Sequence, residues 1–167
     1  MESLLMNENV EKKYILFGIG NSGRQDDGLG WAFLDLLNKN EFEKASFEYK
    51  YQLQIEDAEL ICNYNIVIFV DASKNELING YKFYTCKPSN KHSFSTHALL
   101  PETILYLSEH LYDHKPKAYI LEIQGYEWEL KSGLTKTASE NLNKAVEFFN
   151  QKTFLQHIKT EHDKSHK

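Results

Sequence analysis

Residues 66–70 constrain the fold of this chain more than any other segment. They read Ile-Val-Ile-Phe-Val, an apolar run without alternation. A strand that is covered on both faces has this pattern, whereas a half-exposed strand alternates apolar and polar residues. The run therefore predicts a central strand with helices packed on both sides of its sheet.

The segments around that run alternate between strand and helix patterns. We expect further strands at residues 14–19, 47–53, 80–86 and 118–123, and helices at 27–37, 55–62, 101–112 and 135–149. This order predicts parallel strands joined by right-handed helical crossovers. The expected fold is therefore α/β, a single three-layer α/β/α sandwich with a mostly parallel central sheet.

The length and composition fit one such domain. The chain has 167 residues, of which 41% are hydrophobic and 26% charged, as is ordinary for a globular domain. We expect the domain to span residues 1–150 and a polar C-terminal tail to span 151–167.

Charge and hydropathy exclude two classes of partner. The net charge is −5, so the chain lacks the basic surface that nucleic acids or anionic membranes attract. No apolar run approaches the ~20 residues of a membrane span. The N-terminus has no secretory signal, and Cys62 and Cys86 share no close-spaced motif. We therefore expect a cytoplasmic protein with reduced thiols.

Two carboxylates and one imidazole are expected at one edge of the sheet. Asp27 lies in the glycine-rich segment after the first strand, Asp71 follows residues 66–70, and His97 lies in the loop before Pro101. In open α/β sheets, ligands bind outside the carboxyl ends of the strands. One nitrogen and two carboxylate ligands suit Ni²⁺ or Zn²⁺ and leave positions open for water or substrate. A metal-free site, with His97 as general base and one aspartate orienting it, remains the alternative.

Each of these residues also has a purely structural interpretation. Asp71 could form a turn through its own side chain, and a lone histidine is more often a surface residue than a ligand. His92, in the same loop as His97, is assigned no role. The expected convergence of three groups at one edge favours the functional interpretation.

Asp26 and Asp27 together could simply cap the following helix. A carboxylate at a helix N-terminus accepts a backbone N–H and suits the helix dipole, at ~1 kcal/mol. That interpretation explains one aspartate and does not require two. We assign the cap to Asp26 and expect Asp27 to face the crevice.

The glycine spacing also matches a dinucleotide fingerprint. Gly18, Gly20 and Gly23 stand at the required intervals, after a strand and before a helix. In such a site the helix N-terminus receives a pyrophosphate, and the carboxylates of Asp26 and Asp27 would repel it. The second strand also ends without the acidic residue that would bind a ribose. A dinucleotide-binding enzyme is therefore a minor alternative.

Several motifs resemble those of a known family. Gly18-Ile19-Gly20-Asn21 followed by Asp26-Asp27-Gly28-Leu29-Gly30 resembles the signature of the hydrogenase maturation endopeptidases. These enzymes remove the C-terminal extension from the nickel-loaded large-subunit precursor of [NiFe] hydrogenases. The resemblance continues, in the same order, through residues 67–72, 95–99, 125–127 and 133–135. It implies an α/β/α sandwich and a nickel-dependent endopeptidase that acts on such a precursor.

The resemblance also implies roles for particular residues. The family's three metal-contacting positions map onto Asp27, Asp71 and His97, which would be both the metal ligands and the catalytic residues. The substrate loop and the border of the cleft would be formed by Gly18, Gly20, Asn21, Asp26, Gly28, Tyr126 and Glu127. Nickel would arrive with the precursor, and zinc or a similar divalent ion would be able to occupy the site in vitro.

Two departures from the family pattern concern loops. The family often has an apolar residue where Gly23 stands, and many members carry Asp-Gly-Gly-Thr where this chain has residues 52–56. The second departure bears on substrate choice more than on activity. A non-catalytic nickel-checkpoint or docking module for the precursor is the alternative from another functional class.

Overall fold

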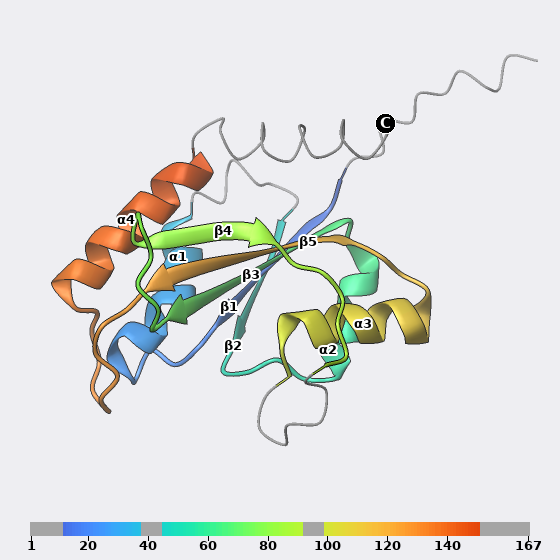
Figure 1. Cartoon of the computed structure of the whole chain (residues 1–167), viewed down its shortest axis with the longest axis horizontal. Coiled ribbons are helices and arrows are strands. Elements are labelled where there is room, and N and C mark those ends of the chain that lie inside the picture. The colour runs from blue at the N-terminus through green and yellow to red at the C-terminus, as the bar shows by residue number, and fades with distance from the viewer. Residues whose placement is uncertain (1–11, 38–44, 92–98, 151–167) are drawn as a thin grey trace, which may run out of the picture.

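The computed structural model describes residues 12–37, 45–91 and 99–150, which form one five-stranded sheet with helices on both faces (Figure 1). The strands are β1 (Tyr14–Ile19), β2 (Ala45–Lys50), β3 (Ile66–Ser73), β4 (Tyr81–Thr85) and β5 (Lys117–Gln124). The helices are α1 (Leu29–Leu36), α2 (Glu56–Leu60), α3 (Pro101–Tyr112) and α4 (Lys136–Asn150), with 3₁₀ turns η2 (Gln25–Gly28) and η4 (Ile61–Asn63). The predicted α/β sandwich is confirmed.

The strand order is β2-β1-β3-β5-β4. The pairs β1–β2, β1–β3 and β3–β5 are parallel, whereas β4 pairs antiparallel with β5 at one edge. The sheet is mostly parallel, as predicted, and β4 is the strand that is not joined by a helical crossover. Only residues 74–80 join β3 to β4, and a parallel connection needs a dozen or more residues.

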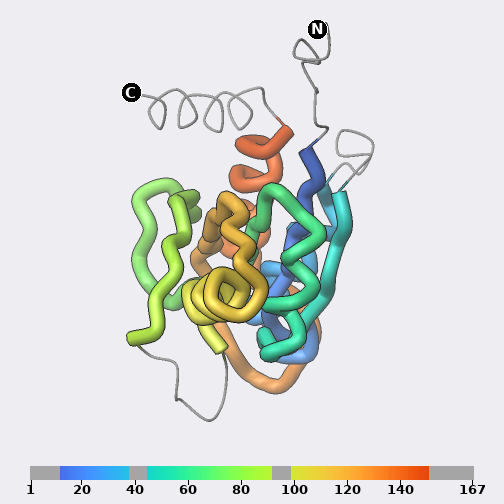
Figure 2. The backbone as a smooth tube through the Cα atoms, turned by 90° about the vertical axis from the view of Figure 1, so that its right-hand side faces the viewer, coloured from blue at the N-terminus to red at the C-terminus, as the bar shows by residue number. Residues whose placement is uncertain are grey.

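The two faces of the sheet carry separate hydrophobic cores. Leu16, Ile68 and Leu121 pack with α1 and α4 on one face, in a core that includes Phe33 and Phe149. The opposite core joins the alternate strand residues to α2 and α3 and contains Phe17, Val67, Phe69, Ala58, Ile104 and Leu105. Figure 2 shows α3 and α4 on opposite sides of the strands. Residues 66–70 are thus buried on both faces, as their sequence predicts.

Three element boundaries differ from expectation in ways that affect the site. β3 continues to Ser73, so Asp71 lies within the strand and not after its end. The strand extends because its ladder with β5 continues through Asp71 and Glu122 to Ser73 and Gln124. α1 begins at Leu29, after the turn η2, and β2 ends at Lys50. The expected C-terminal tail lies outside the described residues.

Gly30 allows α1 to pack unusually close to the sheet. A Cβ atom at this position would lie 2.6 Å from the carbonyl oxygen of Val70 and 2.8 Å from that of Ile19. Both neighbours are strand backbone, which cannot rotate away as a side chain can. The glycine therefore fixes the distance between α1 and the strands β1 and β3.

We expect Gly30→Ala to destabilise the fold by about 1–3 kcal/mol, because the added methyl group overpacks the helix–sheet contact. Chemical denaturation measures the free energy of unfolding. Gly23→Ala is the matched control, since a Cβ there meets only the side-chain oxygen of Asn21, at 3.1 Å. Equal stabilities of the two variants would contradict this account of Gly30.

Candidate functional site

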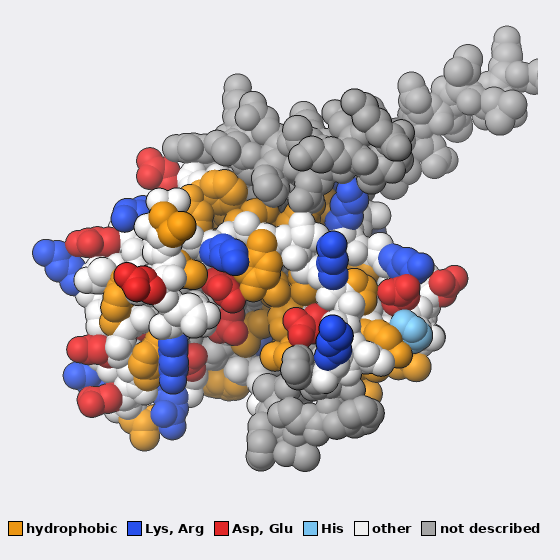
Figure 3. Space-filling model, in the orientation of Figure 1, with side chains coloured by type: hydrophobic (Ala, Val, Ile, Leu, Met, Phe, Trp, Pro, Cys, Tyr) orange, Lys and Arg blue, Asp and Glu red, His pale blue; other side chains and the backbone are white. Residues whose placement is uncertain are grey.

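The candidate site lies where the strand order reverses. The chain leaves β1 toward β2 on one side, while β3 pairs with β1 on the other side. Asp27 belongs to η2, directly after β1, and Asp71 is paired in register with Ile19, the last residue of β1. The structure therefore brings the two predicted carboxylates to one edge of the sheet. Figure 3 shows acidic side chains within the hollow on the front face of the molecule.

Burial shifts both carboxylates toward the neutral, protonated form. The pKa of Asp71 is raised to about 7: burial is the largest cause, a hydrogen bond from the Ala72 backbone opposes it, and the negative charges of Asp27 and Glu122 add to the rise. Burial also raises the pKa of Asp27, while a hydrogen bond from the Asn21 backbone and the charges of Arg24 and Lys74 lower it. Like charges close together in a partly buried crevice are stabilised when a cation binds between them.

The third predicted member, His97, lies outside the described residues, as does the control residue His92. In the part of the chain that the structure describes, no group of three His, Cys, Asp or Glu side chains is arranged to hold a metal ion. The two aspartates alone supply an incomplete donor set. The third ligand expected from the sequence, His97, stays a prediction.

Glu122 is a neighbour that the sequence interpretation missed. It stands on β5 directly opposite Asp71, so both side chains project from the same face of the sheet. The phenol of Tyr84 donates a hydrogen bond of 2.9 Å to Glu122 Oε1. The available signal was a single charged residue within the apolar strand segment of residues 118–123.

Asp26 does not cap the following helix, so that expectation is wrong. Neither η2 nor α1 has a side-chain cap. Instead the fully buried Asp26 carboxylate accepts four hydrogen bonds, from the N–H groups of Tyr126 (2.7 Å), Glu127 (3.1 Å) and Thr135 (2.8 Å) and from the Thr135 hydroxyl (2.8 Å). Asp26 therefore has no oxygen surface left for a substrate. It ties η2 to the loop after β5 and to the start of α4.

The glycine-rich loop folds back on Asp27. Gly20 has a φ of 138°, and a Cβ there would overlap the carbonyl oxygen of Asp27. That carbonyl accepts the N–H of Asn21 at 3.1 Å, and Asn21 Oδ1 accepts the N–H of Gly23 at 2.8 Å. The N–H groups of Gly20 and Arg24 also bond to protein carbonyls. A dinucleotide site would point such groups at phosphates, so the loop geometry opposes that alternative.

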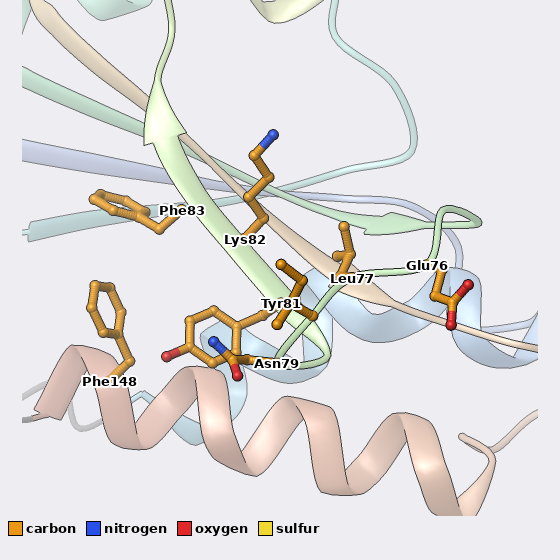
Figure 4. Close-up of a pocket in the computed structure, with 8 residues that line it drawn as sticks. Glu76, Leu77, Asn79, Tyr81, Lys82, Phe83 and Phe148 are labelled. Atoms are coloured by element: carbon orange, nitrogen blue, oxygen red, sulfur yellow. The ribbon is translucent and has the colours of Figure 1, made fainter.

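A pocket of about 510 Å³ lies elsewhere, on the α4 side of β4. Figure 4 shows Tyr81, Phe83 and Phe148 around it, with Lys82 pointing away from the aromatic rings. Neither Asp27 nor Asp71 lines this pocket. It is therefore separate from the carboxylate site.

No protein-family model matches the chain, and no curated protein sequence matches it. Several solved structures match the chain. The hydrogenase maturating endopeptidase HybD from E. coli is 18% identical, with 81% of this chain and 88% of that chain covered and a TM-score of 0.58. The chain has the fold of the hydrogenase maturation endopeptidases. The [NiFe] hydrogenase maturation protease HycI from Thermococcus kodakarensis KOD1 is also 18% identical, with 83% and 90% covered and a TM-score of 0.59. An endopeptidase from Escherichia coli is 16% identical, with 81% and 88% covered and a TM-score of 0.61.

These similarities confirm the fold that the motif resemblance implies. Within residues 12–37, 45–91 and 99–150, moreover, no helix is long and apolar enough to cross a membrane. Fold does not by itself fix activity.

We expect Asp26→Asn to destabilise the protein by about 3–5 kcal/mol, because an amide NH₂ would face donors that a buried carboxylate now satisfies. Chemical denaturation is the measurement. Asp35→Asn is the control, since this exposed carboxylate accepts one hydrogen bond, from Tyr49 at 2.7 Å. A loss below about 1 kcal/mol for both variants would show that the Asp26 hydrogen bonds stabilise little.

The raised pKa of Asp71 predicts a pH dependence of stability. Its folded pKa of about 7 exceeds the ordinary aspartate pKa of 3.8, so the folded state binds this proton more tightly than the unfolded state. The proton on Asp71 therefore stabilises the folded state fully below pH 3.8, and this stabilisation is lost as the pH rises to about 7. Wild type should therefore lose stability relative to Asp71→Asn over that window, as measured by urea denaturation with a metal chelator present. Parallel pH curves for the two proteins would contradict the assignment.

Proposed function

We propose that this chain is an endopeptidase that removes the C-terminal extension of a [NiFe] hydrogenase large-subunit precursor. The observation that carries the proposal is the meeting of Asp27 and Asp71 at the switch point of the sheet. The shared fold with maturation endopeptidases supports it, and so do the sequence motifs that resemble that family.

Nickel is part of the substrate in this proposal. Asp27, Asp71 and His97 contact the nickel that the precursor already holds, and zinc or a similar ion substitutes for it in vitro. Burial raises the pKa of both carboxylates because their negative charges lose hydration. A divalent cation between them would stabilise both charges. Contact with the nickel places the neighbouring peptide bond in the crevice. There the metal either polarises the carbonyl or lowers the pKa of the attacking water.

The surrounding loops have distinct tasks. Gly20 and Asn21 hold the backbone of Asp27 by close contact and hydrogen bonding. Tyr126 and Glu127 are exposed, and their backbone is fixed by Asp26. We assign them to the border of the cleft, where the precursor enters.

The two cysteines fit a reducing compartment. Cys62 and Cys86 are both free, and burial raises the pKa of the Cys86 thiol to about 12. Such a thiol is unreactive at neutral pH, so it has no part in the proposed hydrolysis. We place the reaction in the cytoplasm, where thiols stay reduced.

Intact-mass spectrometry of the nickel-loaded and nickel-free precursor tests the proposal. We expect wild type to release one defined C-terminal peptide from the nickel-loaded precursor only. His97→Ala should abolish this cleavage without unfolding the domain, because it removes the nitrogen ligand. His92→Ala, a histidine of the same loop, is the matched control and should cleave normally.

Three other results would each change the conclusion. A stable complex without loss of mass would favour the docking module. Normal cleavage by His97→Ala would remove His97 from the site. An unchanged precursor mass together with thermal stabilisation by NAD or FAD, but not by nickel, would revive the dinucleotide alternative.

A further inference from the structure

Gln25 has an unusual conformation next to the candidate site. Its φ is 51°, in the left-handed region that is unfavourable for a residue with a Cβ atom. The side chain is only 5% exposed. It begins the turn η2, which also holds Asp26 and Asp27. A strained, buried polar residue beside a functional carboxylate calls for a physical explanation.

Three hydrogen bonds join Gln25 to the loop that follows β5. Its backbone N–H donates to the carbonyl of Lys131 at 2.9 Å. Its side-chain Oε1 accepts the N–H of Glu129 at 3.0 Å, and its Nε2 donates to Glu127 Oε2 at 3.0 Å. The left-handed backbone aims the main chain and both amide atoms at one loop. We call residues 125–134 the wall loop.

Several side chains of the wall loop are exposed, while hydrogen bonds from η2 hold its backbone. Tyr126 is 43% exposed and Leu130 is 77% exposed, and Glu127 is exposed as well. Loops with such surfaces are usually among the least constrained parts of a protein. Here Gln25 and Asp26 bind its backbone from the turn that carries Asp27. The constraint preserves the position of exposed side chains beside the site.

We propose that Gln25 is a positioning residue for the nickel-bearing precursor, holding the wall loop in the shape that the precursor contacts. This inference rests on the proposed function. Gln25 touches neither nickel nor the scissile bond. Its effect is on binding, through Tyr126, Glu127 and Leu130, and not on the chemical step at Asp27.

The amide chemistry of Gln25 gives a specific test. Position 25 needs an acceptor for the Glu129 N–H and a donor for the Glu127 carboxylate, and only an amide of this length supplies both. Gln25→Glu keeps the acceptor and replaces the donor by a second carboxylate oxygen facing Glu127. In a Glu127→Gln background the new carboxylate meets an amide that can donate to it, so the bond is restored with its direction reversed.

The experiment is a double-mutant cycle of Gln25→Glu and Glu127→Gln, measured by precursor cleavage and by equilibrium binding of the nickel-loaded precursor. With Glu127 present, we expect Gln25→Glu to raise KM and Kd about tenfold, and kcat to change less than about threefold. With Glu127→Gln present, the same substitution should change KM and Kd less than about threefold. Asn63→Asp adds the same charge to an exposed position on η4 and controls for net charge.

Thermal unfolding of each variant separates positioning from folding. A lower Tm for Gln25→Glu with unchanged KM and Kd would overturn the inference, as would an equal rise of KM and Kd in both backgrounds. Wild type that binds the precursor without cutting it would overturn the proposed activity, and the Kd values would still test Gln25. Wild type that neither binds nor cuts the precursor would overturn both.

Discussion

The structure depends on one buried carboxylate. Asp26 accepts three backbone N–H groups and one hydroxyl, and in doing so joins the turn after β1 to a segment about a hundred positions later in the sequence. The turn after β1, the loop after β5 and the start of α4 are held at one point. A buried charge needs this degree of hydrogen bonding to be tolerated. The geometry of the carboxyl edge is therefore set by the requirements of Asp26.

Adjacent aspartates thus have opposite electrostatic conditions. The buried Asp26 carboxylate accepts four hydrogen bonds, whereas burial raises the pKa of Asp27 despite the opposing effects of the Asn21 backbone hydrogen bond and the charges of Arg24 and Lys74. Asp71 shares this condition and adds a like charge nearby. One residue stabilises the loop, and its neighbour, held by the same turn, stays available to a cation. A carboxylate whose negative charge is less stabilised by the protein is stabilised more by a bound divalent ion.

The sequence predicted the parts of the fold that local pattern controls. Residues 66–70 predicted a strand buried on both faces, and Pro101 marked the start of α3, since both signals arise from a few neighbouring residues. The antiparallel direction of β4 was missed because it depends on the short connection after β3. The role of Asp26 was missed for a similar reason, since all four of its hydrogen bonds come from residues about a hundred positions away. The pairing of Asp71 with Glu122 likewise exists only once β3 and β5 are adjacent.

The glycine-rich loop shows how one spacing can serve two kinds of site. In a dinucleotide fold, the glycines leave N–H groups pointing outward at phosphates. Here the N–H groups of Gly20, Asn21 and Gly23 are bonded inside the protein, and Gly30 brings α1 against the strands. The loop therefore presents side chains, the half-buried Asp27 carboxylate among them, and not an amide cradle. A carboxylate at this position agrees with the proposed contact to a metal ion, whereas the amide cradle of a nucleotide fold binds an anion.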